Sequence, residues 1–307
     1  YLNKIKETES GLLQPWHKQG LHLSGGILPI ELTVFRNFLD GYKNIAEGPY
    51  YGGAFSTIAK QDPNPVELIN ISDQVNAGVN LITFFGHSSP GTIDIDIGYV
   101  SDPTMGYNNP GKYPAFLING CNAGNFFTES TSFGEDWILT ANKGARNFIA
   151  HSSFGFTNSL WYYSNLFYET GFADSLYINK GIGEVQQEVA RLYMSVAPEN
   201  MANITQVQQM MLLGDPAVKL FNFGKPDYEI TAASLSLVSF DDKPVTALSD
   251  SFAVQVIIKN RALADPRPVK IRTIRMLPDG TELTYDSLVT AIANTDTVRI
   301  TLPRVSG

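Results

Sequence analysis

The only cysteine of the 307-residue chain, Cys121, lies in the stretch PAFLINGCNAGNF (residues 114–126). An apolar run precedes it and small or polar residues follow it, so it stands where a buried strand is expected to end. The run VNLITFFGHSS (79–89) ends in a similar way, at Gly86 and His87. A thiol becomes a nucleophile when a nearby imidazole accepts its proton. These two residue types therefore suit acyl transfer through sulfur.

Glycine-containing turns at the two run ends supply further parts of such a site. Gly120 permits a sharp turn before Cys121, and the backbone N–H groups of Cys121 and Ser88 are candidate oxyanion donors. A lone cysteine at a strand end is more often structural than catalytic, and a histidine there is usually a satisfied polar residue. Order and spacing alone leave the catalytic and structural interpretations balanced.

A second histidine competes with His87 as the partner of Cys121. His151 ends the run ARNFIAHSS (145–153), but we expect it to line a substrate pocket rather than to act as the base. The candidate pocket residues are Gly86, Ser89, His151, Ser152 and Ser153. His17 and His22, near the first predicted strand LHLSGG (21–26), are expected to be structural.

Helices are predicted between the apolar runs. PIELTVFRNFLDGY (29–42) has helical spacing, and NPVELINISDQVNAG (64–78) reads as a helix capped by Asn64 and ended by Gly78. Ser132 and Glu135 form a capping-box pattern before DWILTAN (136–142). Buried strands that alternate with helices predict a mostly parallel sheet. Ligands bind at the carboxyl ends of such strands, where His87 and Cys121 would share one edge.

The pattern changes after about residue 229. Phe252, Val254, Val256 and Ile258 alternate with polar residues, and PDG (278–280) is a turn signal. We therefore predict an α/β domain over residues 1–224 and a small all-β, immunoglobulin-like sandwich over residues 225–307.

Four segments together resemble the gingipain family of cysteine peptidases, of the caspase-like clan. They are NAGVNLITFFGHSS, KYPAFLINGCNAGNF, SFGEDWILTANKGARNFIAHSS and MMLLGDPAVKL. The family pattern places Gly-His at one strand end and a cysteine at the next, here 34 residues later (121 minus 87), with Gly-Asp-Pro near the end of the domain. The resemblance covers roughly residues 1–224. The Gly-His-Ser-Ser variant looks most like the branch of type IX secretion sortases of the PorU kind.

The resemblance implies a caspase-like fold in which His87 is the catalytic histidine and Cys121 the nucleophile. It implies a cysteine endopeptidase or a sortase-like transpeptidase that acts on secreted proteins, outside the cell or at the outer-membrane surface of a bacterium. Protein or peptide substrates and secretion-system components would be its partners. No cofactor is implied, although members of the family bind structural calcium through oxygen ligands. The histidine-orienting acid has no match by motif; Asp94 and Asp96 are the nearby candidates, unless they are solvated residues of an edge segment.

The composition argues against several other classes of function. The net charge of -8, without a basic cluster, argues against a nucleic-acid partner. No apolar run approaches the roughly 20 residues of a membrane span, and one cysteine excludes an internal disulfide. The chain starts without methionine or a signal peptide, so it reads as a piece of a longer protein. Two other hypotheses stay open: a non-catalytic secretion or surface component that keeps the peptidase fold, and a binding role carried by the sandwich.

Overall fold

The structure is a computed structural model that describes residues 1–128, 130–196, 199–241, 243–246 and 249–304. The chain divides into two compact units. The first comprises residues 1–48 and 53–222, and the second comprises residues 49–52 and 223–307. The short segment 49–52 thus belongs to the second unit, although the residues on either side of it belong to the first unit.

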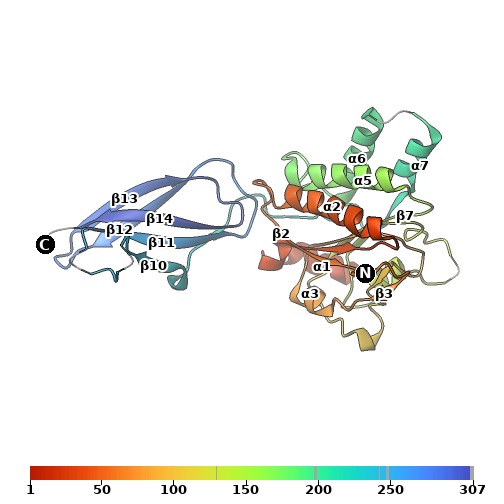
Figure 1. Ribbon diagram of the computed structural model, residues 1–307, viewed down its shortest axis with the longest axis horizontal. Helices are drawn as coiled ribbons and strands as arrows, with labels where there is room; N and C mark the ends of the chain where they lie inside the picture. Colours follow the sequence, from red (N-terminus) through yellow and green to blue (C-terminus); the bar gives the residue numbers. More distant parts are fainter. Residues whose placement is uncertain (129, 197–198, 242, 247–248, 305–307) are drawn as a thin grey trace. The chain divides into compact units, whose positions relative to one another are not determined.

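A six-stranded sheet forms the centre of the first unit, in the order β2-β1-β4-β6-β7-β8 (Figure 1). The strands are β1 (Gln19–Ser24), β2 (Ala54–Ala59), β4 (Leu81–Phe85), β6 (Ala115–Asn119), β7 (Asn147–His151) and β8 (Met210–Gly214). The first five run parallel to their neighbours, and β8 is antiparallel to β7. The predicted mostly parallel sheet is therefore confirmed.

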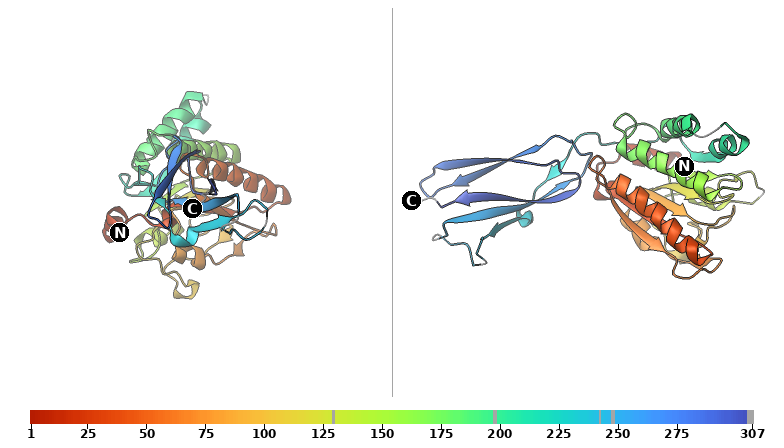
Figure 2. Two further views of the ribbon diagram at one scale, coloured as in Figure 1. Left: turned by 90° about the vertical axis from the view of Figure 1, so that its left-hand side faces the viewer. Right: turned by 45° about the horizontal axis from the view of Figure 1, so that its top comes forward.

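Helices cover both faces of this sheet. On one face α2 (Pro29–Ala46) and α5 (Thr157–Tyr168) lie side by side, with α6 (Ile182–Val196) and α7 (Met201–Gln209) next to α5 (Figures 1 and 2). On the other lie α3 (Ser72–Ala77) and α4 (Phe133–Leu139), whose apolar side chains join those of the strands in one buried cluster. Helix α1 (Leu2–Ser10) is tied to α4, because the Lys4 ammonium donates to the carbonyl of Ile138 at 2.9 Å.

Alternation along the strands assigns each side chain to one of the two faces. Leu23, Phe84 and Ile118 belong to the apolar cluster on the α3 and α4 side. The alternating residues point to the α5 side, where apolar side chains such as Phe85 and Leu117 are joined by a few polar ones. There the Thr83 hydroxyl lies 2.6 Å from the hydroxyl of Tyr168. His22 Nε2 lies 2.9 Å from the same hydroxyl, and burial lowers the pKa of His22 to about 3. His22 is therefore a neutral member of a buried polar network.

The predicted helix over residues 64–78 is wrong in its first half. Residues Glu67–Leu68 form strand β3, which pairs in parallel with β5 (Ile95–Asp96). This pairing gives the backbone N–H groups acceptors that local helical signals cannot anticipate. Helix α3 begins only at Ser72, whose N–H donates to the side chain of Asn70 at 2.8 Å. Gly78 ends the helix at a positive φ of 107°, as predicted.

The capping box predicted from Ser132 and Glu135 is confirmed at the start of α4. The Glu135 carboxylate accepts the Ser132 N–H at 2.8 Å, and the Ser132 hydroxyl accepts the Glu135 N–H at 3.3 Å. The unit also contains two short 3-10 helices, at Pro15–Lys18 and Pro103–Met105, and one turn of π-helix at Glu169–Ala173.

The second unit consists of antiparallel sheets, as predicted. Strands β10 (Leu235–Val238), β11 (Ser251–Asn260) and β14 (Thr295–Pro303) pair in that order, β9 (Tyr228–Glu229) adds to β11, and β12 (Val269–Met276) pairs with β13 (Glu282–Val289). A short helical turn at Ala232–Ser234 precedes β10. Side chains of both sheets, such as Val256 and Ile271, share one apolar cluster. The immunoglobulin-like assignment stays a prediction.

Trp137 offers a test of the packing between α4 and the sheet. Its ring is fully buried, and it contacts the ring of Phe116 on β6 at a centroid distance of 5.0 Å. Trp137→Ala should lower the free energy of unfolding by about 3–5 kcal/mol, because the cavity cannot collapse between two rigid elements. Leu139→Ala, on the same helix but 60% exposed, is the matched control and should change little. Chemical denaturation measures both, and equal effects would contradict this assignment of the core.

Candidate active site

The register between β4 and β6 brings His87 and Cys121 to one edge of the sheet. Phe85 and Asn119 are paired residues of these parallel neighbours, and His87 and Cys121 each stand two residues beyond that pair. The two loops touch, because the Ser88 hydroxyl donates to the carbonyl oxygen of Cys121 at 2.7 Å. We call this edge, at the carboxyl ends of the parallel strands, the rim.

The loop that carries Cys121 has little freedom. Gly120 has no room for a side chain, because a Cβ there would stand 2.1 Å from the Ser88 hydroxyl. Asn122, the next residue after the cysteine, adopts a left-handed conformation with φ of 58°. Its N–H donates to the carbonyl of Ser153 at 2.8 Å. The backbone around the thiol is therefore fixed from both the β4 and the β7 side.

The thiol itself is half-buried and close to the segment that follows β7. Cys121 Sγ lies 3.8 Å from the carbonyl oxygen of Gly155. Phe154 and Phe156, on either side of that glycine, are exposed by 74% and 65%. The nucleophile candidate thus lies beside a segment that exposes apolar side chains, which suits contact with a peptide.

Glu31 contacts the imidazole of His87, and the sequence analysis missed this residue. The Glu31 carboxylate lies 3.1 Å from His87 Nε2, and the two side chains are 20% and 43% exposed. Glu31 stands in the first turn of α2, where the same oxygen accepts the N–H groups of Ile27 at 2.9 Å and Leu28 at 3.0 Å. The sequence contains one signal at this position, the Pro-x-Glu of PIELTVF. That pattern predicts the start of a helix, but it does not predict a carboxylate that contacts a distant histidine.

The ionisation of Glu31 reflects these contacts. Partial burial acts to raise its pKa, but the N–H of Ile27 and the His87 side chain lower it, and the net pKa lies below the ordinary glutamate value. Glu31 is therefore a carboxylate at neutral pH. Its contact with Nε2 leaves Nδ1 of His87 as the nitrogen available to accept a proton.

Asp94, a candidate acid from the sequence, is buried and contacts the backbone of His87. One of its oxygens accepts the N–H of Gly26 at 2.7 Å and the N–H of His87 at 3.2 Å. The other oxygen is buried without a partner, at a place where a Cβ on Gly25 would stand 1.9 Å from it. Burial raises the pKa of Asp94 against the effect of those N–H groups. Asp94 thus joins the ends of β1 and β4 and is not a solvated edge residue.

Of the other sequence candidates, Asp96 is not brought to His87, and the rest lie at or just after the ends of β4 and β7. Asp96 accepts the N–H of Gly98 at 2.8 Å within its own turn. The His151 imidazole is buried, lies 2.9 Å from the carbonyl of Ser153 and has a pKa lowered by burial. The Ser152 N–H donates to the carbonyl of Gln209, and the Ser89 N–H donates to the carbonyl of Thr92, both at 2.8 Å. Gly86 donates its N–H to the carbonyl of Asn119 at 3.0 Å.

The candidate oxyanion donors are the backbone N–H groups of Ser88 and Cys121. Neither takes part in the hydrogen bonds between the described strands. Ser88 faces Ile93 in an antiparallel bridge whose hydrogen bonds are made by the flanking residues, Ser89 with Thr92 and Asp94 with His87. In the described part of the chain, neither the N–H of Ser88 nor that of Cys121 has an acceptor within the protein. Both are therefore free to donate to a ligand at the rim.

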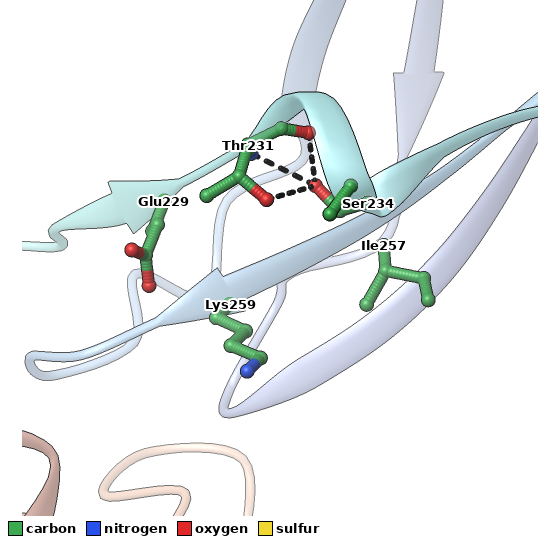
Figure 3. A pocket seen from close by; sticks show the side chains of 6 residues that line it. Glu229, Thr231, Ser234, Ile257 and Lys259 are labelled. Carbon is green, nitrogen blue, oxygen red and sulfur yellow. Dashed lines mark hydrogen bonds between the residues drawn. The ribbon is translucent and has the colours of Figure 1, made fainter.

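A pocket in the second unit lacks, among its described residues, the cysteine and histidine that acyl transfer would need. A pocket of about 260 Å³ in the second unit is lined by Glu229, Thr231, Ala233, Ser234, Ile257 and Lys259 (Figure 3). There the Ser234 hydroxyl accepts the N–H of Thr231 at 2.8 Å and closes a local turn. Across the described ranges, no three His, Cys, Asp or Glu side chains cluster in a way that could hold a metal ion. None of the described helices is long and apolar enough to cross a membrane.

A cysteine and a carboxylate-bound histidine at the rim of a mostly parallel sheet are residue types that a cysteine peptidase needs. Residues 1–221 match Peptidase family C25, the gingipain family, and the chain belongs to this family. Two similar solved structures agree in fold: the Arg-specific cysteine proteinase gingipain R, and the complex of the pro- and mature domains of RgpB from Porphyromonas gingivalis. The first is 16% identical with a TM-score of 0.53, over 96% of this chain and 71% of that one. The second is 15% identical with a TM-score of 0.57, over 98% and 72%. No curated protein matches the sequence.

Asp94 generates a prediction about stability at the rim. Asp94→Ala leaves two buried N–H groups without an acceptor and should lower the free energy of unfolding by about 1–3 kcal/mol. Asp94→Asn keeps an acceptor oxygen and should cost less. Because the folded pKa is raised, stability from this group is present below the ordinary aspartate pKa and falls as pH rises through the folded pKa. Chemical denaturation across the acid range should show this fall in the native chain and not in Asp94→Asn; identical pH profiles would contradict it.

Proposed function

We propose that this chain is a cysteine peptidase or transpeptidase that cleaves peptide bonds through an acyl-enzyme on Cys121, with His87 as acid and base and Glu31 as the acid that orients it. The observation that carries the proposal is the contact of Glu31 with His87 Nε2 beside the loop of Cys121. A structural histidine needs no carboxylate from another element, whereas a base needs a fixed tautomer.

In the first step His87 Nδ1 accepts the thiol proton while Cys121 Sγ bonds to the carbonyl carbon. The N–H groups of Ser88 and Cys121 donate to the oxygen, which carries the developing negative charge. The imidazolium that forms is stabilised by the Glu31 carboxylate. It then donates its proton to the amide nitrogen as the C–N bond breaks, and the amine leaves.

In the second step an acceptor releases the acyl group from sulfur. His87 takes a proton from the acceptor and the acceptor bonds to the carbonyl carbon. The C–S bond then breaks, and the leaving sulfur takes the proton back from His87. Water as acceptor gives proteolysis, and an amine gives sortase-like transfer. The Gly-His-Ser-Ser sequence at 86–89 supports placing the chain with the PorU kind of sortase, which would act on secreted proteins at the bacterial surface with secretion components as partners.

Cys121→Ala should abolish activity, because the nucleophile is lost while the small side chain preserves the loop. We expect a loss of about 10³-fold or more in cleavage of a secreted-protein substrate. A thiol-reactive acyl-enzyme trap should label the native chain at Cys121 and leave Cys121→Ala unlabelled. Full activity of Cys121→Ala would contradict the proposal. An unlabelled native chain with an open site would favour the alternative, a non-catalytic secretion or surface component that keeps the peptidase fold.

Glu31→Gln separates the charge of Glu31 from its role as a helix cap. The amide oxygen still accepts the N–H groups of Ile27 and Leu28, but the imidazolium loses its counter-charge. We expect kcat to fall by about 10²-fold with little change in KM. The native carboxylate stays ionised above the ordinary glutamate pKa and is lost only as pH falls through its lowered folded pKa.

The control for Glu31→Gln is Asp40→Asn on the same helix, where a half-exposed carboxylate pairs with Arg36. That variant should keep normal activity. A purely structural role for Glu31 would appear as lost stability with an unchanged kcat per folded molecule, and this outcome would remove Glu31 from the mechanism.

A further inference from the structure

A pocket of about 220 Å³ opens beside His87. Its walls come from two segments, the residues before β3 and the loop between β4 and β5. The lining residues are Pro65, Val66, His87, Ser88, Ser89, Thr92, Ile93 and Asp94. No described residue of the loop that carries Cys121 is among them.

The pocket and the thiol lie toward different neighbours of β4. Asp94, in the pocket wall, bonds to Gly26 at the end of β1. Cys121 follows β6, and in the sheet β4 stands between β1 and β6. Ser88 separates the two, since it lines the pocket while its hydroxyl contacts the Cys121 carbonyl. A substrate with its carbonyl at the thiol reaches the pocket if its chain continues past His87.

From this placement we infer that the pocket binds the side chain of the residue on the amine side of the scissile bond, and that it selects uncharged, apolar side chains there. The inference rests on the proposed function, because His87 must reach the nitrogen of that residue to protonate it. The side chain attached beside that nitrogen then lies next to the imidazole, where the pocket begins.

The volume fits a single side chain. Sites for whole small molecules measure roughly 300–1,000 Å³, and this pocket is smaller. A pocket of this kind discriminates by size and by the cost of burying charge or polarity.

The lining favours an apolar occupant. Pro65, Val66 and Ile93 present carbon atoms, and Val66 is 50% exposed, so it is available to a ligand. The Ser89 hydroxyl is already paired with the backbone of Thr92. The Asp94 carboxyl is buried: one oxygen accepts the N–H groups of Gly26 and His87, and the other lies against Gly25, so little of it is exposed to a side chain in the pocket.

Acyl transfer would use the same pocket. An acceptor amine attacks along the path by which the leaving amine departed, so its side chain occupies the same place. The pocket would then select both the residue after the cleaved bond and the first residue of an acceptor.

Digestion of a proteome-derived peptide library tests the inference without a known cleavage motif. Mass spectrometry of the products gives the residue on each side of every cleaved bond. The native chain should favour Val, Leu or Ile after the bond. Val66→Asp should reduce cleavage before those residues by about tenfold and increase cleavage before Lys and Arg, while the preference before the bond stays the same.

Leu68→Asp is the matched control, because Leu68 is also exposed, lies two residues away and is absent from the pocket lining. It should keep the native profile. An acyl-enzyme trap that ends at the cleaved carbonyl does not reach the pocket and should label both variants at the native rate. Normal labelling with an unchanged profile in Val66→Asp, or a change confined to the residue before the bond, overturns the inference. Absence of labelling in the native chain overturns the proposed function instead.

Discussion

The parallel, in-register pairing of β4 with β6 is the constraint on which the rest of the site depends. Because Phe85 and Asn119 are partners, the loops that follow them begin at the same height along the sheet, and His87 and Cys121 emerge together. Buried side chains on both faces fix this register, since a slip by one residue would move every side chain of a strand to the opposite face. The chemistry of the rim is thus a product of core packing on either side of the sheet.

Two carboxylates then fix the histidine, each through a different part of it. Glu31 contacts the ring, and Asp94 contacts the backbone N–H of the same residue. Asp94 also bonds to Gly26, in the segment that leads into α2, so the helix that supplies Glu31 is anchored to the strand that supplies His87. The environments differ: burial keeps the pKa of Asp94 raised, whereas the contacts of Glu31 lower its pKa. One carboxyl is suited to structure and the other to holding a charge.

The sequence was sufficient for four parallel strands (β1, β4, β6 and β7), for helices α2 and α4, and for placing the loops of His87 and Cys121 at one edge, because hydrophobic runs and caps are local signals. It did not indicate β2, β8, α6 or α7. It was insufficient for residues 67–68, where pairing with β5 outweighs a helix-capping pattern. It also could not connect Glu31 to His87. These residues are 56 positions apart, and their contact depends on the angle at which α2 leaves the rim. Long-range contacts between side chains of this kind have no periodicity to reveal them.

Glu31 uses one oxygen both for the first N–H groups of α2 and for the imidazole. Helix ends open locally with a free energy well below that of global unfolding. Each such opening of the first turn of α2 releases His87 from its counter-ion while the sheet and core remain intact. Fraying at this one helix end therefore separates Glu31 from His87 at a lower free-energy cost than the melting of the fold.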